Sequence, residues 1–311
     1  MQTSANYRKC VGFQTFAHAP QAALKELAAG ACAVFGTPDE PGHGRRAGTA
    51  LGPHAIRETV AVQLAAYADG EVVNLITGQG SRLRSAPALL DLGDLSPELC
   101  SDAALDDAVE QLVTEIVRRS ACPVLLGGSD RCLNAFLSSV WQERPTTRLL
   151  MLSNSVESLA LAVGSKPLQE RQPGSAMLLG PCGLQALRHW ELLASASVRI
   201  IPAEALHANE TDTLQAVSDW IESDATPCCL IADMQVLDSG YAAGTPQIDV
   251  GGLTPQQFMA VSNTWRGLPA LAGVAVLNCA PALDLRGHTE HLAAHGLLQA
   301  LAQVLFEAVQ P

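Results

Sequence analysis

The feature that most constrains the fold of this 311-residue chain is the alternation of short apolar runs with longer amphipathic stretches. Each apolar run is long enough for one strand and too short for a helix of ordinary length. Strands that are apolar on both faces are usually covered by helices on both sides, so the pattern predicts a parallel sheet between two helical layers. The predicted strands are Ala31–Phe35, Val72–Ile76, Leu89–Leu92, Pro123–Leu126, Leu149–Leu152, Ala176–Leu179, Val198–Ile201, Cys228–Ala232 and Gly273–Leu277.

Between these runs, apolar residues recur at helical spacing. The clearest examples are Asp106–Arg119, Gly183–Ala194, Thr211–Glu222 and His291–Phe306. The alternation of strands and helices predicts a three-layer αβα fold with a central, mostly parallel sheet. No linker, repeat or low-complexity segment divides the chain, so we expect a single domain over residues 1–311, with residues 1–30 as an N-terminal extension packed on it.

Composition excludes several classes of partner. The chain has 19 basic and 31 acidic residues and a net charge of −12, which argues against binding to nucleic acids or anionic membranes. No apolar stretch approaches the roughly 20 residues of a membrane span, and Met1–Cys10 lacks the apolar core of a signal peptide. Nine scattered cysteines without a C-x-x-C pair indicate reduced thiols. These features predict a cytoplasmic protein.

Ligands of open parallel sheets bind beyond the carboxyl ends of the strands. The side chains to examine therefore follow the predicted strands, at Gly36, Asp91, Gly127, Ser153, Gly180, Asp233 and Asn278. Two other groups of polar residues have plainer interpretations. Asp39 and Glu40 are expected to be solvated acids. His288, His291 and His295 share one helix, and we favour a surface or interface face over a metal site.

An ordered set of segments resembles the ureohydrolases, the superfamily of arginases and agmatinases. Its elements are Val11–Pro20, Gly36–Gly42, Arg46, Gly48, Gly52–Arg57, Asp91–Asp94, Pro123–Gly128, Gly180–Gly183, Asp233–Thr254 and Pro281–Asp284. Their order and spacing hold from about residue 11 to the C-terminus. The resemblance implies an arginase-like fold. In that family two divalent metal ions activate a bridging water, which attacks a guanidinium carbon.

The resemblance also implies where the family's two His and four Asp metal ligands would lie. The first His, in a Gly-Gly-Asp-His-Ser turn, corresponds to Asp130. The Asp-Ala-His-x-Asp motif corresponds to Ser153, Ser155 and Glu157, and the late Asp-x-Asp motif to Asp233 and Gln235. The first metal would then face Asp130, Ser153, Glu157 and Asp233, and the second Ser153, Ser155, Asp233 and Gln235.

This set is degenerate. The second site keeps one anionic ligand and no imidazole, so a binuclear centre is not expected. Asp130, Glu157 and Asp233 remain a weak candidate for a single hard ion, against a metal-free cluster balanced by Arg131 or another nearby cation. The family's His-Gly corresponds to Gly164–Ser165, and its substrate-facing Glu to Asn278. We therefore assign no catalytic residue and no metal to this chain.

Two functions are compatible with this pattern. The first is a non-catalytic structural or regulatory subunit of a heteromeric guanidine-hydrolysing enzyme, similar to the degenerate subunit of metformin hydrolase. Its partner would be a metal-competent paralogue with a binuclear Ni or Mn centre, in a trimeric or hexameric assembly. The alternative is a homomeric pseudoenzyme or altered hydrolase in which Asp130, Glu157 and Asp233 bind a guanidino or amine ligand. The loops Asp39–Arg46 and Tyr241–Asp249 are candidates for subunit contacts.

Overall fold

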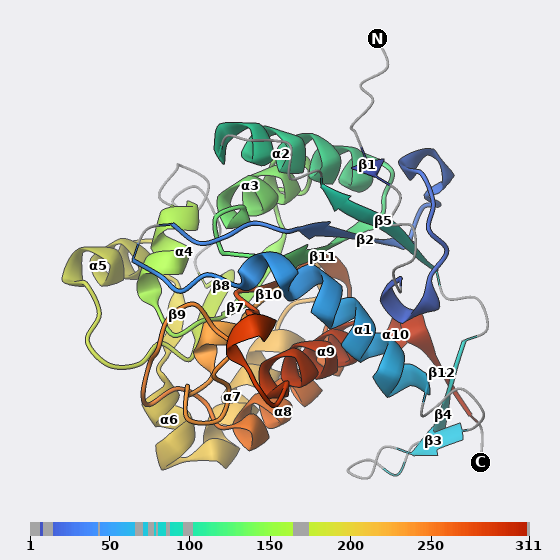
Figure 1. The fold of residues 1–311 in the computed structure, drawn as a ribbon. Helices are drawn as coiled ribbons and strands as arrows, with labels where there is room; N and C mark the ends of the chain where they lie inside the picture. Colours follow the sequence, from blue (N-terminus) through green and yellow to red (C-terminus); the bar gives the residue numbers. More distant parts are fainter. Residues whose placement is uncertain are drawn as a thin grey trace.

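A nine-stranded sheet forms the centre of the protein. The computed structural model describes residues 7–8, 15–42, 44–65, 71–73, 78, 80–84, 88–95, 102–163 and 174–309. Across the sheet the strand order is β1-β5-β2-β6-β11-β10-β7-β8-β9 (Figure 1). The strands are β1 (Tyr7–Arg8), β2 (Cys32–Thr37), β5 (Leu89–Leu95), β6 (Cys122–Gly127), β7 (Arg148–Leu152), β8 (Ala176–Leu179), β9 (Arg199–Ile201), β10 (Cys228–Asp233) and β11 (Leu271–Leu277). All neighbours pair in parallel except β1 with β5.

Helices cover both faces of this sheet. One layer consists of α2 (Asp102–Arg118), α3 (Leu133–Glu143), α4 (Val156–Val163) and α5 (Leu187–Ser195). The opposite layer consists of α1 (Gly52–Ala65), α6 (Ala203–Ala208), α7 (Glu210–Glu222), α8 (Pro255–Thr264) and α9 (His288–Ala300), followed by α10 (Ala302–Leu305) (Figure 1). The predicted three-layer α/β fold is confirmed.

The two cores follow from the two-residue period of the strands. In β10, Leu230 and Ala232 face the layer that contains α1 and α9, whereas Cys229 and Ile231 face the layer formed by α2 to α5. All four side chains are buried, which explains why this strand reads as a continuous apolar run.

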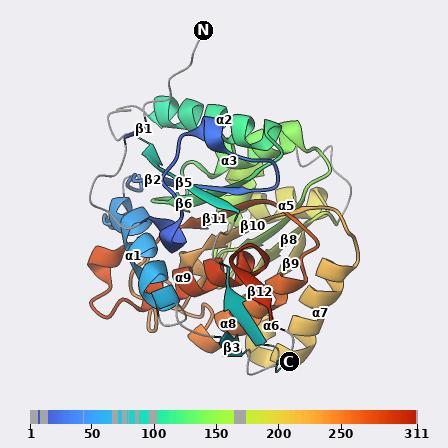
Figure 2. The same ribbon diagram turned by 90° about the vertical axis from the view of Figure 1, so that its right-hand side faces the viewer.

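One predicted strand lies elsewhere. The described part of Val72–Ile76 belongs to β3 (Glu71–Val73), which pairs antiparallel with β4 (Gly80–Leu83) in a separate three-stranded sheet completed by β12 (Phe306–Ala308) (Figure 2). Val73 is 57% exposed, so the prediction of a buried strand is wrong here. The run is apolar, but it pairs with the short strand β4 in a small sheet in which Leu83 of β4 and Phe306 of β12 pack against the core while Val73 stays exposed.

A buried ion pair fixes α1 against the carboxyl end of β5. Arg57 donates from Nε to Asp91 Oδ2 at 2.9 Å and from Nη1 to Asp94 Oδ1 at 2.6 Å. The backbone N–H of Phe16 adds a hydrogen bond to Asp91 Oδ2 at 2.8 Å. These three segments, distant in sequence, are therefore joined at the edge of the sheet where the other parallel strands also end.

Two negative findings concern the described residues. No helix among them combines the length and apolar character that a membrane crossing requires. Their seven cysteines are all buried and form no disulfide.

Candidate functional site

The ends of three adjacent strands bring the central polar residues of the candidate site together. β10 lies between β7 and β11 in the sheet and runs parallel to both. Asp233 is the last residue of β10, Ser153 follows β7 directly, and Asn278 follows β11 directly. Asp233 therefore meets Ser153, 80 positions away, and Asn278, 45 positions away, at the carboxyl edge of the sheet. This is the edge at which parallel sheets bind ligands.

Asp233 is the centre of this group and is completely buried. Its Oδ2 accepts a hydrogen bond from Ser153 Oγ at 2.8 Å. Its Oδ1 accepts from Asn278 Nδ2 at 2.9 Å and from the backbone N–H of Gln235 at 3.0 Å. Burial, reinforced by the negative charge of Asp130, raises the pKa of Asp233 to about 6, although the three hydrogen bonds act in the opposite direction. These three donors to the carboxylate are all neutral.

Two amides around Asp233 keep unsatisfied oxygens. Asn278 is fully buried and Gln235 is 3% exposed, and each directs its NH₂ group toward the Asp233 carboxylate. Asn278 Oδ1 and Gln235 Oε1 have no hydrogen-bond partner in the described part of the chain. Such buried acceptors are uncommon. Asn278 also has a positive φ of 60°, held by a backbone hydrogen bond to Gly128 O at 2.7 Å.

Asp130, after β6, is balanced by a cation from another loop. Arg45 Nη1 donates to Asp130 Oδ1 at 2.7 Å, and Ser158 Oγ lies 3.4 Å from Asp130 Oδ2. The sequence predicts Arg131 or another nearby cation as the balancing group. Arg45 takes this role at Asp130, whereas Arg131 Nε lies 3.9 Å from Asp39 Oδ2. Nothing in the sequence pattern identifies Arg45, because the contact spans 85 residues.

The interpretation as a solvated acid is wrong for Asp39, which is buried, whereas Glu40 is exposed as expected but is bound to the backbone. Asp39 is 8% exposed and accepts from Ser129 through Oγ at 2.5 Å and through the backbone N–H at 3.2 Å. Burial raises its pKa to about 6. Glu40 accepts from the backbone N–H of Gly48 at 2.7 Å and of Thr49 at 3.2 Å, at the turn before α1. Both acids therefore stabilise the loops beside the site.

Ser155 and Glu157 lie at the edge of the group. The backbone N–H of Ser155 donates to Ser153 Oγ at 3.3 Å, and that of Glu157 donates to Ser155 Oγ at 3.0 Å. The Glu157 side chain is half-exposed, and its carboxylate lies 3.9 Å from His189 Nδ1. The structure thus places Ser155 beside Ser153 but directs Glu157 toward α5. Gly164 and Ser165 lie outside the described residues.

The donor set does not fit the metal pair that the family resemblance implies. In the described part of the chain, no three His, Cys, Asp or Glu side chains are placed to hold a metal ion, so Asp130, Glu157 and Asp233 do not form such a group. The Ser153 hydroxyl is neutral and donates to Asp233, and Asp130 is paired with Arg45. Thiolate, imidazole and clustered carboxylate ligands, which divalent metals prefer, are therefore lacking at these positions.

The loop after β10 closes one side of the site. Asn154, next to Ser153, donates from Nδ2 to the Asp249 carboxylate. Arg46 reaches the same loop, donating from Nη2 to Thr245 O at 2.6 Å, and its backbone N–H bonds to Pro246 O at 2.9 Å. Arg46, the residue after Arg45, thus fixes the loop that carries both arginines against the 241–249 loop.

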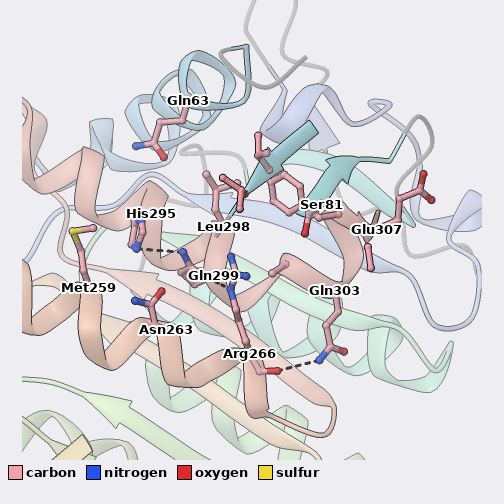
Figure 3. Close-up of a pocket in the computed structure, with 15 residues that line it drawn as sticks. Gln63, Ser81, Met259, Asn263, Arg266, His295, Leu298, Gln299, Gln303 and Glu307 are labelled. Carbon is pink, nitrogen blue, oxygen red and sulfur yellow. Dashed lines mark hydrogen bonds between the residues drawn. The ribbon is translucent and has the colours of Figure 1, made fainter. Parts of the chain in front are cut away.

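A cavity of about 480 Å³ lies apart from this site (Figure 3). It is lined by α8, α9 and the small sheet, next to the segment that leads into β11 rather than where β11 ends. His295 lies on its wall, 3.4 Å from Gln299. His288 and His291 instead bond to the backbone oxygens of Tyr241 and Gly287. The three histidines do not converge.

Comparison with known proteins identifies the origin of this framework. The model of the arginase family matches residues 30–152 and 168–302. The mitochondrial guanidino acid hydrolase of Homo sapiens is 24% identical over 286 residues, covering 86% of this chain and 77% of that protein. A hypothetical agmatinase from Burkholderia thailandensis superimposes with a TM-score of 0.77 at 21% identity, over 94% of this chain and 91% of that chain. Proclavaminate amidino hydrolase from Streptomyces clavuligerus gives 0.75 at 19% identity, over 96% and 98%.

Proposed function

Because this chain belongs to the arginase family, we propose that it is a catalytically degenerate member, serving as the non-catalytic structural or regulatory subunit of a heteromeric guanidine-hydrolysing enzyme. Guanidino acid hydrolase and agmatinase are among its similar proteins. The substrate of the complex would therefore be a guanidino compound, hydrolysed at a C–N bond in the partner subunit. The partner would be a metal-competent paralogue carrying a binuclear Ni or Mn centre.

One observation carries this proposal: the polar residues at the former ligand positions make hydrogen bonds with one another and with Arg45, although the charge of Asp233 is only partly compensated. Asp233 accepts hydrogen bonds from an amide, a hydroxyl and a backbone N–H, and Asp130 is paired with Arg45. A metal pair would have to displace Arg45 and would still lack anionic or imidazole ligands at Ser153, Ser155 and Gln235. A chain that keeps the family framework and not this ligand set is suited to assembly rather than to catalysis.

The test is elemental analysis by plasma mass spectrometry of the purified chain, alone and after co-purification with a ureohydrolase encoded beside it. We expect substoichiometric metal and no hydrolysis of agmatine or guanidino acids by the chain alone. The complex should contain two metal ions per partner subunit and be active. Two tightly bound metal ions per chain in the isolated protein, with activity, would overturn the proposal.

A second candidate is a homomeric protein that binds a guanidino or amine ligand at the position of the family's active site, near Asp130, Glu157 and Asp233. The unpaired oxygens of Asn278 and Gln235 favour it, because a ligand with several N–H groups would satisfy these acceptors, which lack a donor among the described residues. Thermal unfolding in the presence of agmatine, arginine or guanidine separates the two functions. A ligand that binds the native state raises the melting temperature. A rise with one of these compounds, without any paralogue present, would support the second candidate.

A further inference from the structure

The cavity of about 480 Å³ beside α8, α9 and the small sheet contains a cation without an acidic partner (Figure 3). Arg266, in the turn after α8, donates from Nε to Gln299 Oε1 at 2.5 Å. In the described part of the chain, this neutral amide is the one acceptor of its side chain. Burial lowers the pKa of Arg266, and no described carboxylate acts in the opposite direction. The terminal nitrogens of the guanidinium group can therefore donate to an anion.

The other charged groups around the cavity do not offset this positive charge. His295, on α9, is a second basic group, and its pKa is lowered by burial and by the charge of Arg266. Glu307 of β12 is the only acidic residue among the described residues of the wall. Its carboxylate is bound by Arg82 at 2.5 Å and lies 3.7 Å from Arg84. Figure 3 shows Glu307 at the end of the cavity far from His295. The Arg266 end of the cavity therefore favours a negatively charged ligand.

Much of the remaining wall is apolar. Leu298 of α9 is 8% exposed, and Phe306 of β12 packs against the core beside it. Met259 of α8 and Val73 of β3 also line the cavity, and both are exposed in the described structure. Cavities that bind small molecules commonly have volumes of roughly 300–1,000 Å³ and combine apolar walls with a few polar groups. These walls match the apolar body of a ligand whose charge lies at Arg266.

We propose that this cavity binds a small monocarboxylate with an apolar body, its carboxylate on Arg266 and its body against the apolar wall. Gln299 orients the guanidinium group, since its oxygen accepts from Arg266 Nε and its Nε2 lies 3.4 Å from His295 Nε2. Asn263, on the same wall, supplies a neutral amide donor (Figure 3). A single arginine beside apolar walls suits a monocarboxylate better than a phosphate group, which clusters of arginines usually bind.

This site is separate from the candidate functional site. Arg266 lies before β11 (Leu271–Leu277), whereas Asn278 and Asp233 lie at the carboxyl ends of the strands. The proposal therefore does not depend on the proposed function, and a metal-loaded, active chain would leave it standing.

The experiment titrates the full-length protein with 3-phenylpropionate and with its neutral amide, 3-phenylpropanamide, by saturation-transfer difference NMR at neutral pH and constant ionic strength. For a ligand of this size we expect a dissociation constant on the order of 1 mM. The amide should bind about fivefold more weakly, because it cannot form a charge-assisted hydrogen bond with Arg266, whose partial exposure limits the difference. Equal affinities, or no binding of the carboxylate, would overturn the proposal.

A pair of arginine variants locates the binding. Arg266→Met should weaken binding of 3-phenylpropionate about fivefold and leave binding of the amide unchanged. Arg118→Met is the matched control, because Arg118 lies on α2 and does not line the cavity. This control should keep the affinity of the unmodified chain. An unchanged affinity in Arg266→Met, or an equal loss in Arg118→Met, would show that the carboxylate does not bind at Arg266.

A second variant keeps the proposal testable if Arg266→Met does not fold. Gln303 is exposed, lines the cavity, and donates from Nε2 to Arg266 O at 3.3 Å. Gln303→Glu places a carboxylate of nearly the same size beside Arg266, so like charges should weaken binding of 3-phenylpropionate severalfold while the amide still binds. The same titration measures both ligands. Equal affinity of Gln303→Glu and the unmodified chain for 3-phenylpropionate would overturn the proposal.

Discussion

At the scale of single residues, the candidate site is organised by the cost of burying Asp233. A fully buried carboxylate is stable only if hydrogen bonds or an opposite charge compensate its lost hydration. Here Ser153 and Asn278 supply neutral donors, and the positive charge of Arg45 is bound to Asp130 instead. The compensation is incomplete, because the pKa of Asp233 remains raised to about 6.

This shift predicts a pH dependence of stability. The folded pKa of about 6 exceeds the ordinary aspartate value of 3.8, so the folded state holds the proton more tightly. The contribution of Asp233 to the free energy of unfolding is therefore greatest below about pH 4 and is lost as the pH rises through 6. Between pH 5 and pH 7.5 the free energy of unfolding of the unmodified chain should fall by about 1 kcal/mol more than that of Asp233→Asn. Urea unfolding at both pH values measures this, and equal losses in the two proteins would contradict it.

Gly128 is constrained by its closeness to Asp39. A Cβ at this position would lie 2.3 Å from Asp39 O and 2.7 Å from Asp39 N, both backbone atoms that cannot move aside easily. We expect Gly128→Ala to lower the free energy of unfolding by about 3 kcal/mol or more and to disturb the adjacent Ser129 and Asp130. Gly42→Ala is the control, since a Cβ there would meet no described heavy atom within 4 Å beyond its chain neighbours. A similar denaturation midpoint for the two variants would show that the Asp39 loop yields.

How much of the site can be predicted from sequence is clear from individual residues. Ser153, Asp233 and Asn278 can be placed together because parallel strands end at one edge. Arg45 cannot, because a loop side chain that crosses to another loop leaves no periodic signal. The sequence pattern places Asp39 in solvent for a similar reason. Its burial results from Ser129 and Gly128, which meet it only in the folded chain.

At the scale of elements, the contact between α1 and β5 depends on one buried cation. Arg57 is 4% exposed and pairs with Asp91, which is 1% exposed. Replacement of Arg57 by Met would leave Asp91 buried without its counter-charge, so the free energy of unfolding should fall by about 3–5 kcal/mol. Arg118→Met removes the exposed ion pair with Glu143 and should leave the denaturation midpoint unchanged. Equal effects in thermal or urea unfolding would contradict this account.

The elements themselves are predictable where burial is two-sided. The strands β2 and β5 to β11 coincide with apolar runs because both of their faces meet helices. The helix α1 is not predicted from the sequence pattern, although Ile56, Val60 and Leu64 are buried at helical spacing. Its other residues are mostly apolar or small, so the apolar positions do not stand out at a helical period. The strands β4 and β12 have no such signal, since Leu83 and Phe306 are single apolar residues packed against the core and do not form an apolar run.

At the scale of the whole molecule, two groups of exposed apolar side chains among the described residues are candidates for contact with a partner. One lies around α5 and includes Leu184, Leu187 and Trp190. The other lies on the loop after β10, where Ile248 is 65% and Val250 83% exposed. The second surface adjoins the candidate site, because Asp249 between these residues is hydrogen-bonded to Asn154. A partner bound on that loop would therefore lie close to Ser153, because Asp249 is hydrogen-bonded to the residue that follows Ser153.

This position predicts which surface would mediate the proposed assembly with a metal-competent paralogue. Exposed apolar residues contribute to interfaces when a partner covers them, and a buried aspartate without a counter-charge opposes association. Ile248→Asp should therefore weaken binding of the paralogue by about tenfold or more, since a loss of about 1.4 kcal/mol corresponds to that factor. Leu187→Asp, on the other surface, is the matched control and should retain binding. Sedimentation velocity over a concentration series measures both. Loss of association in Leu187→Asp with retention in Ile248→Asp would place the partner on α5 and leave the loop beside the candidate site uncovered.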